Sequence, residues 1–249
     1  MALTVVIPSA GRADRVRAVK AINADVLCVP ASEAAAYEAR KYGVPIVTHQ
    51  NTVRGLAAKR QWIADRYGDV FMVDDDVKTF VRLWLPTYRR DYRLTPAEAR
   101  DAAEATYETA IELGAYLFGF AFFGDTRLFR PQRPMMLTGY VNGACFGLRA
   151  GSKLRFRTDV VAVEDMVLSG MNAYYHRYLF VDQRFGPRQE KTFANPGGQA
   201  LHRTAETERR DTERLRQLFG AAVVEKRVNP KIGKTHHKTV AQRSLKIPF

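Results

Sequence analysis

The amino-acid sequence predicts an α/β fold, in which a mostly parallel sheet is flanked by helices in a single domain with a basic C-terminal extension. Short apolar runs alternate with segments of helical spacing through the first part of the chain, as in parallel, helix-covered sheets. The chain has 249 residues, of which 46% are hydrophobic, and this suits one large domain with a sizeable core. We divide it into a domain over residues 1–203 and a C-terminal helix and basic tail over 204–249.

Strands and helices are expected to alternate from the N-terminus onward. Apolar runs of four to eight residues predict the strands, and helical spacing predicts the helices between them. The expected strands are 3–8, 26–29, 45–47 and 69–73, and the expected helices are 14–21, 32–41 and 54–67.

The remainder of the chain is less regular. Thr95 is a predicted N-cap, Pro96 the first helical position and Glu98 the partner in a capping box, for a helix that runs to about residue 113. Residues 84–92, rich in aromatic side chains and arginine, are expected to be exposed, and 127–136 is expected to be a loop. Further strands are expected at 115–123, 140–148 and 178–181, and further helices at 165–176 and 204–219.

The charge of the chain indicates a polyanionic partner. Its net charge is +13, and residues 226–249 contain basic residues but no acidic one. Such a tail favours nucleic acid, with a solubilising or lipid-facing tail as the alternative. The basic residues of the tail are Lys226, Arg227, Lys231, Lys234, Lys238, Arg243 and Lys246.

Cys28 and Cys145 both lie in apolar, strand-like segments. We expect two buried thiols and no disulfide, which suits a reducing cytoplasm (the host cytoplasm if the source is a virus). No apolar stretch is long enough to span a membrane, and the N-terminus has no signal-peptide pattern.

The most informative motif is Asp74-Asp75-Asp76, which directly follows the apolar run 70–73. Three carboxylates at the end of a buried strand are not ordinary core, because unpaired buried charge is costly. Ligands of open α/β sheets bind outside the carboxyl ends of the strands. Carboxylates there can hold a hard divalent cation that grips a substrate phosphate. The alternative is a solvated acidic turn.

Two further motifs are typical of a nucleotide site. The turn Pro8-Ser9-Ala10-Gly11-Arg12 is small enough for its backbone N–H groups to approach a nucleotide, and Arg12 can contact a phosphate or base. Gly55 opens a helix that carries Lys59 and Arg60 one turn later, where a basic pair can neutralise a diphosphate. Each motif alone is also compatible with an ordinary turn or a solvated basic helix face.

A second apolar run, 160–163, ends in Glu164-Asp165 and turns into a helix. Acidic residues at a helix N-terminus are favourable through the helix dipole alone, so a structural role is one interpretation. The functional interpretation is a general base, because an acceptor hydroxyl loses its proton as it attacks.

Taken together, these residues resemble GT-A glycosyltransferases. The run Val5-Val6-Ile7-Pro8-Ser9, the helix after Gly55, the three acids and the Glu164-Asp165 pair occur in the family's order, over residues 3 to 203. Residues 142–146 and 197–202 resemble the acceptor-side strand and the C-terminal metal-ligand loop. The resemblance implies a GT-A-like (Rossmann-related) sheet, a nucleotide sugar and a divalent metal. A small, basic version of this fold resembles the base J-type DNA glucosyltransferases associated with TET/JBP oxygenases, in phages and protists.

The resemblance also implies a role for each candidate residue. Asp76 and Asp74 are expected to hold Mn²⁺ or Mg²⁺, with His202 as a third ligand, although a loop histidine is often only a surface residue. Asp165, or else Glu164, is the expected base. The residues expected to bind the donor, UDP-glucose, are Pro8, Ser9, Gly11, Arg12, Lys59, Asp74 and Asp75.

The expected acceptor is DNA with a hydroxymethyl group on cytosine or uracil, which would leave the base stack to react with inversion at the anomeric carbon. The alternatives are a polysaccharide or glycolipid acceptor, and a non-catalytic nucleic-acid-binding module on a degenerate transferase fold. Aromatic side chains interleaved with arginines can stack on bases and bind phosphates, although Tyr174 and Tyr175 equally suit a core. This set is Trp84, Tyr88, Tyr92, Phe129, Tyr174 and Tyr175 with Arg82, Arg89, Arg90, Arg93, Arg127, Arg130 and Arg133.

Overall fold

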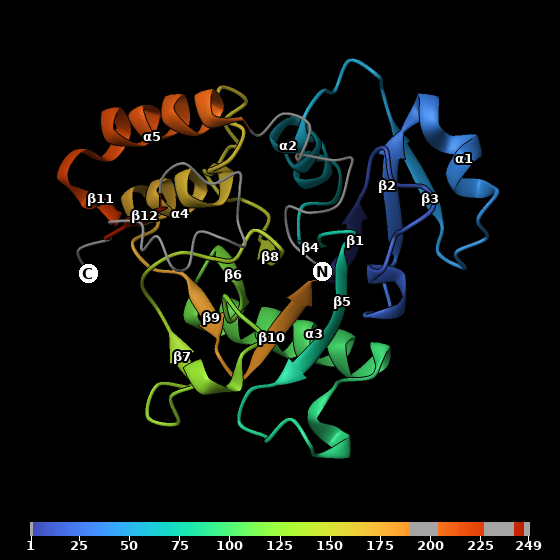
Figure 1. Cartoon of the computed structure of the whole chain (residues 1–249), viewed down its shortest axis with the longest axis horizontal. Coiled ribbons are helices and arrows are strands. Elements are labelled where there is room, and N and C mark those ends of the chain that lie inside the picture. The colour runs from blue at the N-terminus through green and yellow to red at the C-terminus, as the bar shows by residue number, and fades with distance from the viewer. Residues whose placement is uncertain (1, 190–203, 227–241, 247–249) are drawn as a thin grey trace.

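The computed structural model describes residues 2–189, 204–226 and 242–246 (Figure 1). Its centre is an eight-stranded sheet with the order β3-β2-β1-β4-β8-β6-β9-β7. All its strands run in one direction except β8 and β7, so the predicted, mostly parallel sheet is confirmed. The strands are β1 (Thr4–Pro8), β2 (Val26–Pro30), β3 (Ile46–His49), β4 (Val70–Val73), β6 (Leu117–Phe120), β7 (Met135–Met136), β8 (Cys145–Leu148) and β9 (Phe180–Asp182).

Helices cover both faces of this sheet. In β1, Val5 and Ile7 pack into one core together with α1 (Ala34–Glu38) and α3 (Pro96–Leu113). Val6 faces the opposite core, which contains side chains of α2 (Leu56–Tyr67) and α4 (Glu164–Tyr175). Strands that are buried on both faces need near-continuous apolar runs. This explains why the runs at β1 and β4 are such clear signals in the sequence.

The predicted N-terminus of α3 is confirmed in detail. The Thr95 hydroxyl accepts a hydrogen bond from the Glu98 backbone N–H at 3.3 Å, and the Glu98 carboxylate accepts one from the Thr95 N–H at 2.8 Å. This capping box satisfies two N–H groups that the first turn would otherwise leave unpaired.

A second, two-stranded sheet begins at the acidic motif. β5 (Val77–Arg82) follows Asp76 directly and pairs antiparallel with β10 (Phe185–Gln189). Neither strand is among the predicted elements, because both mix apolar with polar residues. Their pairing brings Gln189 next to Asp76 across 113 positions of sequence.

The described part of the C-terminal region packs on the domain. α5 (Ala205–Phe219), which matches the helix expected over 204–219, has Thr204 as its N-cap and lies against α4, where the Phe219 ring occupies the space beside Gly170. A Cβ on Gly170 would lie 2.4 Å from that ring, so the close approach requires glycine. After α5, β11 (Val223–Lys226) pairs antiparallel with β12 (Gln242–Leu245).

Several predictions of local structure were wrong. The expected helix 14–21 is reduced to the 3₁₀ turn Ala18–Lys20, because the Asp75 carbonyl accepts hydrogen bonds from the N–H groups of Arg17 and Ala18. Residues 160–163 are not a strand. The expected helix 32–41 is only the 3₁₀ turn Ala31–Glu33 followed by α1.

Cys28 and Cys145 are buried free thiols, as predicted. Within the described ranges, no helix is long and apolar enough to cross a membrane.

Candidate active site

The candidate site lies at the carboxyl ends of β1 and β4, which are neighbours in the sheet. The turn after β1 contains Ser9 and Arg12, and Asp74, Asp75 and Asp76 follow β4. Because parallel strands end at the same edge, two motifs more than sixty residues apart meet there. The Ser9 hydroxyl donates to an Asp75 carboxylate oxygen at 2.5 Å.

Asp75 holds the turn after β1 in place through hydrogen bonds to Ser9 and Arg12. Its other carboxylate oxygen accepts from Arg12 Nη1 at 2.7 Å, and its side chain is almost wholly buried. The Tyr37 hydroxyl is 2.8 Å from Ser9 Oγ and accepts from the Arg12 backbone N–H at 3.2 Å. Burial raises the pKa of Tyr37 to about 12, so this hydroxyl stays neutral. Ser9 and Arg12 are therefore held in fixed positions.

The conformation of the rest of this turn is determined by its backbone. Pro8 ends β1 in a buried position, and Gly11 has a φ of +65°, a conformation that glycine adopts without steric cost. The Gly11 N–H donates to the Glu33 carboxylate at 2.7 Å. Pro8, Ser9, Gly11 and Arg12 thus lie together as predicted.

The adjacent basic residues Lys59 and Arg60 of α2 are both buried, and they contact different partners. Lys59 lies under the turn, where its ammonium donates to the Ser9 carbonyl at 2.5 Å, and burial lowers its pKa. Arg60 is 1% exposed and stacks over the Phe146 ring at 5.1 Å. Its guanidinium donates to Asp74 at 2.7 Å, to Glu164 at 3.0 Å and to the Gly143 carbonyl.

Arg60 therefore joins the two acidic motifs of the sequence. Asp74 follows β4, whereas Glu164 opens α4. Burial and the neighbouring carboxylates Asp75 and Asp76 raise the pKa of Asp74 to about 7, although the charge of Arg60 opposes the shift. A buried guanidinium is compensated only when several acceptors surround it, and the guanidinium of Arg60 is surrounded in this way.

The carboxylate pair at the start of α4 is divided between two environments. Glu164 is buried and ion-paired with Arg60. Asp165 is only partly buried, and its carboxylate accepts the backbone N–H groups of Gly143 at 3.2 Å and Met166 at 2.8 Å. A Cβ at position 143 would lie 3.0 Å from the Asp165 oxygen, so glycine allows this close contact. Of the two acids, Asp165 is therefore the more exposed and the more accessible to a substrate.

The aromatic residues that were predicted to stack on bases do not all lie on the surface. Trp84 and Tyr88 are exposed, as are Tyr174 and Tyr175, whereas Tyr92 is buried. The tyrosines of α4 are therefore not core. His202 and the tail residues 227–241 lie outside the described residues.

A family model, TAGT or TET-Associated Glycosyltransferase, matches residues 3–198. The chain belongs to this family. It is therefore a nucleotide-sugar-dependent glycosyltransferase, as the motif order implied.

Two solved structures are similar to this TET-associated glycosyltransferase. S. aureus TarS (residues 1–349) has a TM-score of 0.50 and 11% identity, over 89% of this chain and 73% of TarS. Mannosyl-3-phosphoglycerate synthase from Rubrobacter xylanophilus has a TM-score of 0.46 and 15% identity, over 98% of this chain and 85% of that one. The TarS match supports the GT-A-like fold. A comparison with curated proteins gave no significant match.

The carboxylates after β4 fit a divalent metal in part. Within the described ranges, no three His, Cys, Asp or Glu side chains gather into a ready metal cluster. One oxygen of Asp74 binds Arg60, and one oxygen of Asp76 accepts from the Gln189 amide at 2.9 Å. Mg²⁺ is commonly held by one or two carboxylates together with substrate phosphates. Asp74 and Asp76 supply that kind of donor set.

Three residues of the site do not follow from the sequence. The sequence presents Arg60 only as half of a basic pair, Gln189 ends a strand that is not predicted, and Tyr37 lies in a short Ala-rich helix. A buried role for Arg60 has one available signal, since it follows small residues on a helix that packs against the sheet.

Proposed function

We propose that this glycosyltransferase moves glucose from UDP-glucose to the hydroxymethyl group of a modified pyrimidine in DNA, with inversion at the anomeric carbon. The observation that carries the proposal is the ionic chain Asp74–Arg60–Glu164, which lies between the turn after β1 and the N-terminus of α4. The donor site and the general base that activates the acceptor would then be held in place by one network of ion pairs. The family's association with TET supports an oxidised pyrimidine as acceptor.

The turn after β1 would bind the nucleotide part of the donor. Asp75 and Tyr37 hold Ser9 and Arg12 in place before any ligand arrives, which lowers the entropy lost on binding. Lys59 adds a positive charge beneath the Ser9 carbonyl, where it favours a bound diphosphate without contacting solvent. Asp74 would bind toward the ribose or the sugar.

Asp76 and Asp74, with His202 as a third ligand, would hold Mn²⁺ or Mg²⁺. Such an ion stabilises the negative charge that develops on the leaving diphosphate. Gln189 holds Asp76 by its amide and so fixes the carboxylate at the end of the acidic turn.

Asp165 would act as the general base. The acceptor hydroxyl attacks the anomeric carbon of the sugar and forms a new C–O bond, while the bond from that carbon to the diphosphate breaks. The hydroxyl proton passes to the Asp165 carboxylate, and UDP departs with the electron pair. Hydrogen bonds from the Gly143 and Met166 N–H groups orient this carboxylate.

DNA as the acceptor is supported by charge. The chain carries +13, and its tail has seven basic residues and no acidic one. Positive surfaces of this kind bind phosphate backbones by releasing counterions.

The proposal is tested by offering the protein several UDP-sugars and matched oligonucleotides that contain 5-hydroxymethylcytosine, 5-hydroxymethyluracil, cytosine or thymine. Nucleoside mass spectrometry is expected to find one added hexose only on a hydroxymethylated base, and to find none with Asp165→Asn. Transfer to an oligosaccharide or lipid, with none to DNA, would refute the proposed acceptor.

A further inference from the structure

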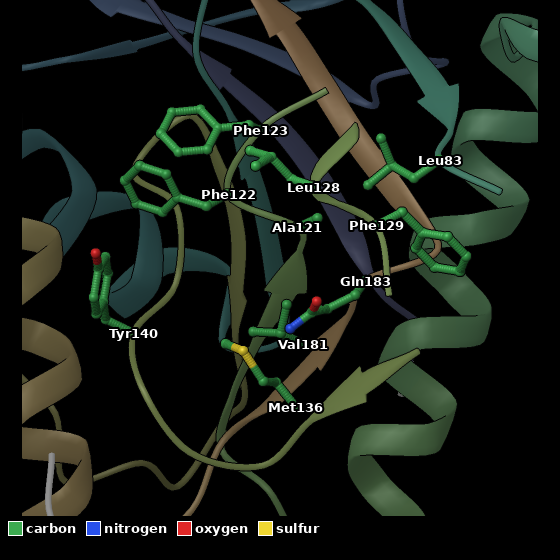
Figure 2. A pocket seen from close by; sticks show the side chains of 10 residues that line it. All are labelled: Leu83, Ala121, Phe122, Phe123, Leu128, Phe129, Met136, Tyr140, Val181 and Gln183. Atoms are coloured by element: carbon green, nitrogen blue, oxygen red, sulfur yellow. The ribbon is translucent and has the colours of Figure 1, made fainter. Parts of the chain in front are cut away.

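A cavity of about 140 Å³ lies between the end of β6 and the segment that leads to β8 (Figure 2). Its walls include Phe122, Phe123, Tyr140 and Leu128, together with Met136, Val181 and Gln183. At roughly 30 Å³ per water molecule in the liquid, it has room for about four to five waters. It is therefore large enough for one small ring and too small for a base pair.

This cavity adjoins the acceptor side of the site. The Phe122 and Tyr140 rings meet edge to face with centroids 5.3 Å apart. Asn142 donates from its side-chain amide to the Phe122 carbonyl at 2.7 Å, and the next residue, Gly143, donates its N–H to Asp165. Asp165 is also close enough to Tyr140 that its charge, together with the larger effect of burial, raises the pKa of Tyr140. One short segment thus forms a wall of the cavity and holds the proposed base.

The lining suits a planar heteroaromatic ring. Phe122 is 38% exposed and Phe123 is 56% exposed, although large apolar side chains are usually covered. Their rings stand edge to face with centroids 4.6 Å apart, and exposed aromatic rings of this kind can stack on a base. The Gln183 side chain adds an amide, which offers both a donor and an acceptor to a base edge.

The chain segment that contributes Leu128 and Phe129 to the cavity is rich in arginine. Leu128 and Phe129 belong to a segment that also carries Arg127, Arg130 and Arg133, all exposed. The Arg127 side chain is 86% exposed, with an ion pair to Asp125. These arginines offer no electrostatic attraction to a neutral saccharide, whereas they attract the phosphate backbone to which a base is attached.

We propose that this cavity receives the extrahelical pyrimidine of the DNA acceptor, which stacks against Phe122 and Phe123 and presents its hydroxymethyl group to Asp165. The inference rests on the proposed function and extends it, because it assigns the acceptor subsite to particular side chains. Unstacking a base costs energy that a stacking surface in the enzyme recovers.

The first test measures steady-state transfer to a hydroxymethylated oligonucleotide with Phe122→Ala and Phe123→Ala. Loss of stacking is expected to raise the acceptor KM about 10- to 100-fold, while the slow hydrolysis of the sugar donor stays unchanged. Phe122→Tyr, which keeps the ring, is expected to stay within about threefold of wild type. Ile111→Ala removes an exposed apolar side chain of α3 outside the cavity and serves as the control.

A second test needs no turnover. An oligonucleotide with 5-iodouracil at the acceptor position is irradiated with the full-length protein, and the cross-linked peptide is mapped by mass spectrometry. Cross-links at Phe122, Phe123 or Tyr140 support the assignment. Cross-links confined to Trp84 or Tyr174, or an unchanged acceptor KM in both alanine variants, overturn it.

The two proposals fail in distinguishable ways. If wild type modifies DNA but the cavity variants do so with normal KM, only the subsite assignment is overturned. If wild type modifies only a saccharide and the same variants weaken that reaction, the cavity binds a sugar, and the assignment to a base is overturned together with the DNA acceptor.

Discussion

The buried Arg60 and the partly buried Asp74 form an ion pair, with 2.7 Å between Nη2 and Oδ1, although the two residues belong to different motifs of the sequence. The same guanidinium binds Glu164 at the start of α4. One buried side chain therefore links the acidic motif after β4 to the start of α4.

Arg60→Met is expected to lower the free energy of unfolding by about 3–5 kcal/mol, because it leaves the buried Glu164 and the partly buried Asp74 uncompensated. It is also expected to abolish transfer. Urea denaturation measures the first effect. Arg66→Met is the matched control, since Arg66 lies exposed on the same helix over Trp62 and Tyr67, and about 1 kcal/mol or less is expected. Equal losses in both variants would contradict the role given to Arg60.

Asp76→Asn is expected to abolish sugar transfer and leave stability near that of wild type. The amide keeps the shape of the side chain and removes a charge that burial disfavours, since burial and the Asp75 charge raise the pKa of Asp76 although the Gln189 amide opposes the shift. Thermal melting and transfer assays with added Mn²⁺ or Mg²⁺ test this. EDTA is expected to stop wild-type turnover, and full activity in EDTA would contradict metal dependence.

Asp165→Asn is expected to lower kcat by about 10²- to 10⁴-fold, the usual contribution of a general base. Donor affinity, measured by calorimetry with UDP, should not change, because the hydrogen bonds of the Asp165 carboxylate go to Gly143 and Met166, which lie outside the turn after β1.

Glu164→Gln separates the two acids. It breaks the ion pair with Arg60 and should therefore lower both stability and activity, whereas Asp165→Asn should lower activity alone. If Glu164→Gln is inactive at wild-type stability and Asp165→Asn is active, the two roles must be exchanged.

Asp211 connects α5 to the segment that precedes α4. Its side chain is wholly buried, and one carboxylate oxygen accepts the N–H groups of Val161 and Ala162, each at 2.7 Å. Asp211→Ala is expected to cost about 1–3 kcal/mol of stability, since it leaves buried donors unpaired. It should also lower kcat, because this segment leads into Glu164 and Asp165. Glu213→Ala, at an exposed position of α5, should do neither, and calorimetric melting with kcat measures both.

The contribution of the basic tail to DNA binding is best tested by substitutions that remove its charges. Deletion of the tail would also remove β12, which pairs with β11. Replacing Lys231, Lys234 and Lys238 by Gln should weaken DNA binding and reduce the salt slope of log K by up to about 0.9 for each DNA phosphate that the tail then leaves unneutralised. Lys20→Gln with Lys41→Gln removes exposed charges elsewhere and is the control. Fluorescence anisotropy at several salt concentrations measures the slope, and an unchanged slope would remove the tail from the DNA interface.

The sequence by itself determined the parts of this protein that depend on local signals. Buried parallel strands need continuous apolar runs, so β1 and β4 were evident, as were the capping box of α3 and the existence of α5. The order of the motifs was enough to indicate the family. Because parallel strands end at one edge, the placement of Ser9 and Asp75 at the same edge of the sheet also followed from the sequence, whereas their direct contact depends on the strand order.

Only the tertiary structure decided what depends on partners distant in the chain. β5 and β10 form because they pair with each other, and their mixed sequences carry no such signal alone. Residues 160–163 are irregular because Asp211, about fifty positions later, satisfies N–H groups of this segment. In the sequence, Lys59 and Arg60 look like an exposed basic pair. In the structure both are buried, and their charges are compensated by hydrogen-bond acceptors from other elements. A charged side chain is buried only where its neighbours compensate it, and those neighbours are set by the packing of the whole domain.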